Sequence, residues 1–495
     1  MEEKIMGWLE KIQIKHILIV IILIFIPILK NDFVGDDFDF IFHWEEIRST
    51  NNISELLKGS LPSEHVGVYR PLRSLLYLIT YNLFGESAIF YHAYSILIHL
   101  IATLYVYKIS KFLTNENSAK ITSLIFGIIP VHTEAVSFIT PSIDTFGIVL
   151  ALLGFYKYIT NKKTLSYTLA FAAAFFYEIT LVLPAIAVFY ELIVNKNTIK
   201  KSITQSKYLW NGALLYILLR IFIINVPSRS TFLGGKLLNN IIISFQSIVI
   251  YFFISVWPHK PTFIHYFGKI SSYTTPEINQ EILEQTSMVN SGFILSLIII
   301  ITSLLFVIKT KNKHIKFGAA WFILSIFPVL NIFPIGSLFS ERYVYLASFG
   351  SALIASQLFM KISKTKYKLS LLPALILFVV FSSKHTLYRN SSYNNEISLW
   401  GSESKMHPQD VVAKYKLGRS YYEKQEYDLA EKAYKEALGL KPNFKRALYH
   451  MSLLKTEQKK YQEAEDYVNK TIFQDPQYQP AIDLKSKIMW LNKSI

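Results

Sequence analysis

The chain has 495 residues, of which 52% are hydrophobic, 15% are aromatic and only 17% are charged. Soluble domains carry about 25% charged residues, so the composition favours a membrane-embedded body. The net charge of +16 argues little for nucleic-acid binding, because the lysines gather in short clusters between apolar segments. The absence of cysteine excludes disulfides, thiolate metal sites and lipidation on cysteine.

Long apolar runs recur along the first four fifths of the chain. With its flanks, each run approaches the ~20 residues that a helix needs to cross a bilayer. The first run ends without a small-residue cleavage site, so we interpret it as a retained span and not as a signal peptide. The runs are 17–29, 89–105, 145–158, 209–225, 241–257, 292–308, 317–333, 344–359 and 369–381.

Clusters of basic residues separate these runs, and the positive-inside rule places such clusters in the cytoplasm. The N-terminus is then cytoplasmic, and both the connections between the clusters and the C-terminal domain lie outside. The membrane is the cell membrane in a prokaryote or the endoplasmic reticulum in a eukaryote. The clusters are 4–15, 108–120, 157–163, 196–207, 309–316 and 361–368, and the outer connections are 31–88, 130–144, 177–178 and 334–342.

Two segments do not fit a simple up-and-down pattern. Three apolar runs lie between Lys207 and Lys309, although two cytoplasmic ends require an even number of crossings, so one run among 209–225, 241–257 and 292–308 is not a full span. The runs 165–176 and 179–194 are also short for a ~30 Å hydrocarbon core. We expect this pair to form a re-entrant hairpin.

The C-terminal part contains an internal repeat. Pro408, Pro442 and Pro476 are spaced by 34 residues, which is the tetratricopeptide period. We therefore predict a membrane domain over 1–388 and a tetratricopeptide domain over 389–495. The latter would comprise a partial repeat that holds Trp400, full repeats at 411–444 and 445–478, and a capping helix from Ala481.

An acidic pair, Asp36 and Asp37, follows the first span on the predicted outer side. The pair could be an ordinary helix cap or a solvated loop. It could also supply a general base, or hold a divalent cation such as Mg or Mn through oxygen, close to a membrane-derived substrate.

Further charged groups come from the other outer connections. Arg70 precedes Pro71 at a span boundary and would suit a phosphate, because a guanidinium offers two parallel donors. Each remaining group could singly be a cap or a surface charge, but together they converge on one face. These groups are His132, Glu134, Asp144, Glu178, Glu341 and Arg342.

This distribution favours an enzyme over an ion-coupled transporter, whose titratable groups usually lie near the membrane midplane. His43, His65, His92 and His99 do not have the spacing of metal ligands. The chain also lacks a phosphate-binding loop, a dinucleotide-binding glycine pattern and a nucleophile elbow, so a soluble nucleotide cofactor is not expected.

Several of these motifs together resemble the transmembrane and tetratricopeptide-repeat O-mannosyltransferases. The order and spacing of the motifs match along nearly the whole chain, and the set is more specific than any single piece. The matching pieces are Asp36-Asp37, the segment 69–72, Tyr91-His92 with His99, the segment 130–136, the segment 341–346 and the C-terminal repeats.

The resemblance implies an all-α, polytopic GT-C glycosyltransferase bundle of about 11–13 spans, followed by the repeat domain. It implies a polyprenyl-phosphate-linked sugar as the donor. The residues demand no cofactor, and a divalent cation at Asp36 and Asp37 stays an open alternative. By likeness, Asp36 or Asp37 would be the base that deprotonates the acceptor hydroxyl. Arg70, His132 and Arg342 would hold the donor phosphate.

The chain departs from the family pattern at two positions. Where relatives tend to have an arginine before the acid of the fourth span, this chain has Ser142-Ile143-Asp144. Where a Lys-Glu pair is common, it has Tyr177-Glu178, so one cationic contact to phosphate is missing. The repeat array is also short.

The leading hypothesis is a membrane glycosyltransferase that moves a sugar, with mannose as a candidate, to protein Ser or Thr hydroxyls outside the cytoplasm. The repeat groove would recruit the protein acceptor. Two alternatives remain open: a non-enzymatic membrane-anchored repeat scaffold for envelope assembly, and a lipid or polysaccharide transporter.

Overall fold

The computed structural model describes residues 10–59, 61, 69–224, 232–257, 259–267, 270–272, 288–332, 334–335, 337–365 and 370–493. His65, for which a metal-ligand role was excluded above, lies outside the described residues. The chain divides into two units, Met1–Tyr393 and Asn394–Ile495. The division lies five residues beyond the predicted end at 388, because the last long helix of the first unit continues to Ser392.

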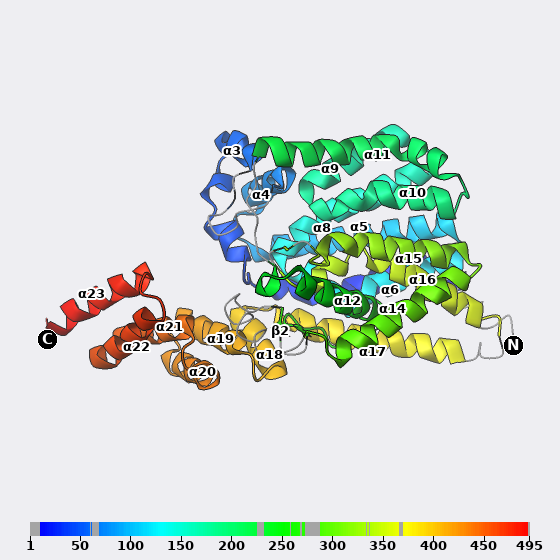
Figure 1. The fold of residues 1–495 in the computed structure, drawn as a ribbon. Helices are drawn as coiled ribbons and strands as arrows, with labels where there is room; N and C mark the ends of the chain where they lie inside the picture. The colour runs from blue at the N-terminus through cyan, green and yellow to red at the C-terminus, as the bar shows by residue number, and fades with distance from the viewer. Residues whose placement is uncertain are drawn as a thin grey trace. The chain divides into compact units, whose positions relative to one another are not determined.

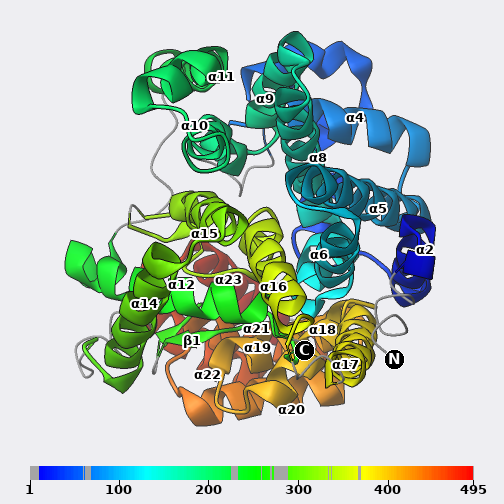
Figure 2. The ribbon, with the colours of Figure 1, turned by 90° about the vertical axis from the view of Figure 1, so that its right-hand side faces the viewer.

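The first unit is a bundle of helices that run side by side, and Figure 2 views many of them nearly end-on. Its helices are α2 (Ile14–Phe25), α3 (Ile53–Lys58), α4 (Pro71–Phe84), α5 (Ala88–Leu113), α6 (Glu116–Ile128), α7 (Thr133–Ser137), α8 (Ile139–Ile159), α9 (Lys163–Phe176), α10 (Leu183–Ile193), α11 (Ile199–Leu219), α12 (Leu237–Ile254), α14 (Ser291–Lys309), α15 (Lys313–Ile326), α16 (Ser348–Ile362) and α17 (Leu371–Ser392). Two strands of two residues each, β1 (Tyr266–Phe267) and β2 (Ile270–Ser271), lie between α12 and α14 in the chain and pair in antiparallel fashion.

Five of the described helices are long and apolar enough to cross a membrane: α5, α8, α12, α14 and α17. The bent pair α6 and α7 raises this number to at most six. The implied 11–13 spans are not reached by single helices, because several apolar runs form shorter helices or end in 3-10 turns. In the first run, for example, α2 has 12 residues and continues as a 3-10 segment from Ile26 that contains Pro27.

The two segments that broke the simple pattern have distinct structures. Among the three runs between Lys207 and Lys309, α12 and α14 qualify as candidate spans by length and hydropathy, and α11 does not. α9 and α10 have 14 and 11 residues and are joined by a 3-10 turn at Glu178–Val182. α9 packs on α8 and α11, whereas α10 packs on α11 and α15, and the re-entrant hairpin stays a prediction.

The interior of the bundle depends on close backbone packing. α15 and α16 meet at Gly318 and Gly350, where a side chain on Gly318 would lie 2.7 Å from the carbonyl oxygen of Gly350. Small residues at such crossings let helices approach closely in membranes, where packing and hydrogen bonds drive helix association. This crossing fixes the start of α16, which begins six residues after Arg342.

The bundle has two distinct ends. Figure 1 shows the segment that contains α3 and α4 at one end, and the opposite end, where α2, α6 and α17 begin, is the N-terminal end. At the N-terminal end, Lys313 donates a hydrogen bond to the carbonyl oxygen of Val194, which joins two of the predicted cytoplasmic connections. The predicted outer connections also contact one another, because Arg70 forms ion pairs with Asp144 and Glu178.

The second unit is a helical repeat domain. Its helices are α18 (Glu396–Met406), α19 (Val411–Glu423), α20 (Tyr427–Leu440), α21 (Lys445–Glu457), α22 (Tyr461–Gln474) and α23 (Gln479–Lys493). α19 with α20 and α21 with α22 form the two predicted repeats, and α18 holds the buried Trp400. Gly418 is required where α19 meets α20, because a β-carbon there would lie 2.6 Å from the ring of Tyr434.

Candidate active site

Arg70 is the centre of the first charged cluster. It precedes Pro71 and α4, and its side chain is buried. Its Nε and Nη2 donate to the two carboxylate oxygens of Glu178, at 2.6 and 2.7 Å, and its Nη1 donates to Asp144 at 2.8 Å. The structure therefore brings together three predicted site residues from three different outer connections.

The charges within this cluster balance. Arg73, also buried, lies 3.3 Å from the second oxygen of Asp144, so two guanidinium groups face two carboxylates. Burial alone would raise the pKa of Glu178, but Arg70 lowers it to about 2. The ring of Tyr177, at the position where a lysine was expected, lies 4.5 Å from the Arg70 guanidinium as a cation–π partner. Arg70 is thus fully engaged within the protein.

Replacement of Arg70 by glutamine is expected to destabilise the first unit by about 3–5 kcal/mol, because it leaves two buried carboxylates without their cation. Unfolding midpoints in detergent would measure the loss. Arg48→Gln is the control, since its pair with Glu86 is exposed and contributes little. Adding Glu178→Gln should recover part of the loss, and an unchanged midpoint for Arg70→Gln would contradict the assignment.

The acidic pair divides into two different environments. Asp37 is fully buried and accepts three hydrogen bonds, from the backbone N–H and hydroxyl of Thr140 and from the N–H of Val34. Asp36 is half-buried, and within the described ranges its carboxylate accepts no hydrogen bond. Asp37 anchors this segment to the start of α8, and Asp36 is the carboxylate that remains accessible.

Burial raises the pKa of Asp37 from its usual 3.8 to about 7, although the hydrogen bonds from Thr140 and Val34 act in the opposite direction. The folded state then holds a proton that the unfolded state loses, so the free energy of unfolding falls as pH rises between about 4 and 7. We expect Asp37→Asn to remove this loss, which amounts to at most about 1.4 kcal/mol per pH unit.

The measurement is the difference in unfolding midpoint between Asp37→Asn and the wild type as the pH is raised through this window. The difference should grow in favour of the variant. Asp39→Asn, a change at a partly exposed acid in the same segment, should show no such trend. A pH-independent difference would mean that Asp37 is ionised throughout.

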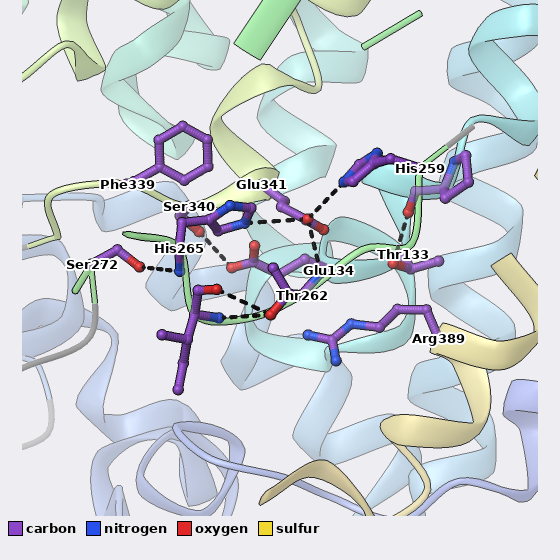
Figure 3. Close-up of polar contacts among 12 residues, drawn as sticks. Thr133, Glu134, His259, Thr262, His265, Ser272, Phe339, Ser340, Glu341 and Arg389 are labelled. Atoms are coloured by element: carbon purple, nitrogen blue, oxygen red, sulfur yellow. Dashed lines mark hydrogen bonds and ion pairs between the residues drawn. The ribbon is translucent and has the colours of Figure 1, made fainter. Parts of the chain in front are cut away.

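Glu341 and Glu134 form a second cluster (Figure 3). Glu341 is buried and lies 3.5 Å from His259 and 3.3 Å from His265, and it accepts the N–H of Thr262 at 3.1 Å. Burial would raise the pKa of Glu341, but the two imidazoles lower it to about 2. These contacts hold the segment between α12 and β1 against the turn before α16.

Arg342 is held by Glu134. Its backbone N–H donates to Glu134 at 3.1 Å, and its guanidinium lies 3.6 Å from the same carboxylate, which also accepts from the Ser340 hydroxyl. The Arg342 side chain keeps a quarter of its surface exposed, unlike Arg70. The charges of Tyr177 and Asp36 also act on it electrostatically.

His132 is the candidate that the structure separates from the others. It is buried, its Nε2 lies 2.8 Å from the Ser348 hydroxyl, and its ring packs 4.4 Å from that of Tyr345. In the described part of the chain, no hydrogen bond or ion pair joins it to another candidate. His132 therefore contributes to packing where the 52° bend between α6 and the following turn occurs.

His259 and His265 belong to the second cluster through their contacts with Glu341, and the sequence reasoning missed them. The available signal was two histidines, six positions apart, in a connection between the apolar runs 241–257 and 292–308. Across the described ranges, no group of three or more His, Asp or Glu side chains has the arrangement of a metal site. The predicted cation at Asp36 and Asp37 stays a prediction.

The fold and the site define a helical, multi-pass membrane protein whose buried charges gather between its predicted outer connections, followed by a tetratricopeptide domain. Residues 70–224 match the family model of the dolichyl-phosphate-mannose-protein mannosyltransferases, and residues 411–444 match that of the tetratricopeptide repeat. The first match begins at Arg70 and includes Asp144 and Glu178.

Relatives of known name extend this resemblance. The chain is 25% identical to protein O-mannosyl-transferase F38B6.6 of Caenorhabditis elegans, over 88% of this chain and 64% of the relative. It is 21% identical to human protein O-mannosyl-transferase TMTC3, over 83% of this chain and 49% of the relative. The chain therefore spans about half to two thirds of the length of these relatives. The matches confirm the resemblance to the transmembrane and tetratricopeptide-repeat O-mannosyltransferases.

Among solved structures, the chain is similar to the crystal structure of ArnT from Cupriavidus metallidurans bound to undecaprenyl phosphate. The identity is 12%, the TM-score is 0.45, and the alignment covers 88% of this chain and 76% of that one.

Proposed function

We propose that this protein is a membrane glycosyltransferase that moves a sugar, with mannose as the first candidate, from a polyprenyl-phosphate donor to protein Ser or Thr hydroxyls on the extracytoplasmic side. The observation that carries the proposal is the environment of Arg342: its side chain is a quarter exposed, its guanidinium faces the single carboxylate of Glu134, and the charge of the half-buried Asp36 acts on it. The names of the relatives support the class of reaction.

In the proposed reaction, Asp36 takes the proton of the acceptor hydroxyl as its oxygen attacks the anomeric carbon. The bond between that carbon and the phosphate oxygen breaks, and the phosphate leaves with one more negative charge. Arg342 stabilises this charge. Arg70 acts indirectly in this scheme, since its donors are used by Asp144 and Glu178. Asp37 positions Asp36.

The repeat domain would bind the protein acceptor, because stacked helical repeats form grooves for extended partners. With the N-terminus in the cytoplasm, the predicted topology places this domain on the same side of the membrane as Asp36. Glycosylation outside the cytoplasm would then act on proteins that cross or leave the membrane.

The test uses the purified full chain in lipid vesicles with a radiolabelled polyprenyl-phosphate mannose and an extract of membrane proteins. Transfer of label to protein by the wild type, and its loss in Asp36→Asn, would support the proposal. If the wild type labels no protein while the donor stays intact, the proposed activity is wrong. Transfer from a donor that carries another hexose would correct the sugar alone.

A further inference from the structure

The first helices of the repeats lie along one side of the second unit. Figure 1 shows α19, α21 and α23 on that side and α20 and α22 on the other, and α21 contacts both α19 and α23. We call this side the repeat face, because its side chains decide which partner it can bind. It is defined by the side chains of Tyr415, Arg419, Arg446, Tyr449, His450 and Tyr478.

A row of aromatic rings crosses the repeat face. Its ring centroids are successively 5.4, 5.5 and 5.4 Å apart, in the order Tyr415, His450, Tyr449 and Tyr478. Tyr415 and Tyr449 are 34 residues apart and therefore hold the same position in successive repeats. Tyr449 and Tyr478 are half-buried, and among the described residues their hydroxyl groups make no hydrogen bond. Tyrosines that present both an apolar ring and a polar end suit the surface of an interface.

Positive charge is concentrated beside His450. The charged side chains that act on its imidazole are Lys416, Arg419 and Arg446, and burial together with these three cations lowers the pKa of His450 to about 4. Arg419 pairs with Glu423 at 2.7 Å, but both side chains are about half exposed, so this pair contributes little. Arg446 is exposed, and within the described residues its side chain makes no ion pair or hydrogen bond. Arg446 is therefore the cation of the repeat face that an anionic group of a partner can reach.

Acidic side chains limit the extent of this positive region. The charge of Glu457 acts on Tyr422, and that of Asp483 acts on Tyr449. These carboxylates would repel a polyanion such as a nucleic acid, because like charges across an interface are unfavourable. A protein segment with one or two carboxylates avoids that repulsion and still matches the cations beside His450.

We propose that the repeat face binds an extended acidic segment of a protein, with an aspartate or glutamate side chain of the partner on Arg446 and the partner's backbone along Tyr449 and Tyr478. The inference rests on the proposed function, in which the repeat domain binds the acceptor, and it adds the chemical class of that acceptor. A guanidinium binds a carboxylate through two parallel N–H groups. Because the row of rings runs on from α19 to the start of α23, the partner crosses the face, and the carboxylate belongs to a side chain and not to a chain end.

The experiment measures fluorescence anisotropy of labelled peptides with the purified full chain in lipid nanodiscs, without donor. The probe is a short peptide of alternating Ser and Glu with both ends capped, and its matched control has Gln in place of Glu. We expect the wild type to bind the Glu peptide at least about tenfold more tightly than the Gln peptide. Arg446→Gln should weaken binding of the Glu peptide roughly tenfold, as expected for the loss of a hydrogen bond to a charged group, and Arg446→Lys should recover part of it. Lys432→Gln, which changes an exposed cation on α20, should bind like the wild type.

Equal affinity of the wild type for the two peptides, or an unchanged affinity for the Glu peptide in Arg446→Gln, would overturn the proposal. If Arg446→Gln does not fold, Arg419→Gln decides, and wild-type affinity in that variant would also overturn it. A Gln peptide with a free C-terminal carboxylate that binds as tightly as the capped Glu peptide would show recognition of a chain end and would overturn the assignment to an internal segment. Sugar transfer without a preference for the Glu peptide would contradict this inference alone, whereas binding of the Glu peptide without sugar transfer would contradict only the proposed function.

Discussion

Asp36→Asn is expected to lower sugar transfer roughly 10²- to 10⁴-fold, the range that a positioned general base contributes. The carboxylate is half-buried, interacts with Arg342 and accepts no hydrogen bond within the described ranges. Asparagine keeps the shape of the side chain but cannot accept a proton. The loss should therefore appear in kcat, and donor binding should change little.

Single-turnover transfer from a labelled polyprenyl-phosphate donor in vesicles would measure this effect. Asp39→Asn is the matched control, because Asp39 lies in the same segment and pairs with the exposed His43. Its transfer rate should stay close to that of the wild type. Equal rates for Asp36→Asn and the control would remove Asp36 from the mechanism and leave Asp37 as the candidate base.

The fold was largely predictable because its signals are periodic or long. The 34-residue spacing of prolines located α19 to α22, and the nine apolar runs each contain or overlap a helix. The number of spans was less predictable. Proline and 3-10 turns shorten helices such as α2, and a helix that packs inside a bundle does not need the full bilayer length.

The gathering of some charged residues was predictable, but the contacts that each of them makes were not. The sign of each charge and the predicted side of the membrane placed Arg70, Asp144 and Glu178 on one face. The Arg70 side chain is in direct contact with the other two. Sequence alone could not show that these acids neutralise Arg70, because pairing depends on which side chains meet across 70 to 110 residues. His259 and His265 were missed because single histidines carry no spacing that distinguishes a site from a core position.

Asp36 and Asp37 illustrate the same limit. Adjacent residues point in different directions, so one carboxylate bonds to Thr140 and the other does not. Their chemistry is set by α8, about 100 residues later in the chain, and no local pattern records that contact.

Arg342→Gln is expected to lower kcat for transfer roughly 10²- to 10³-fold, the effect of removing one group that stabilises charge in a transition state. Arg342 is the better candidate for this role than Arg70. Arg70 makes three short hydrogen bonds to two carboxylates, whereas the Arg342 guanidinium lies 3.6 Å from a single one and a quarter of its side chain is exposed. A departing phosphate could therefore bind Arg342 without breaking a buried ion pair.

Three variants separate this role from general donor binding. If Arg342 acts on the leaving group, kcat and kcat/KM fall together in Arg342→Gln, and Arg342→Lys recovers only part of the rate because a lysine cannot bind phosphate through two parallel donors. Arg48→Gln, which changes an exposed arginine on the same predicted side, should leave both constants unchanged. A rise in KM alone would limit Arg342 to holding the donor. The charge that develops on the phosphate would then have to be stabilised by Arg70, which could reach it only by giving up a bond to Glu178 or Asp144.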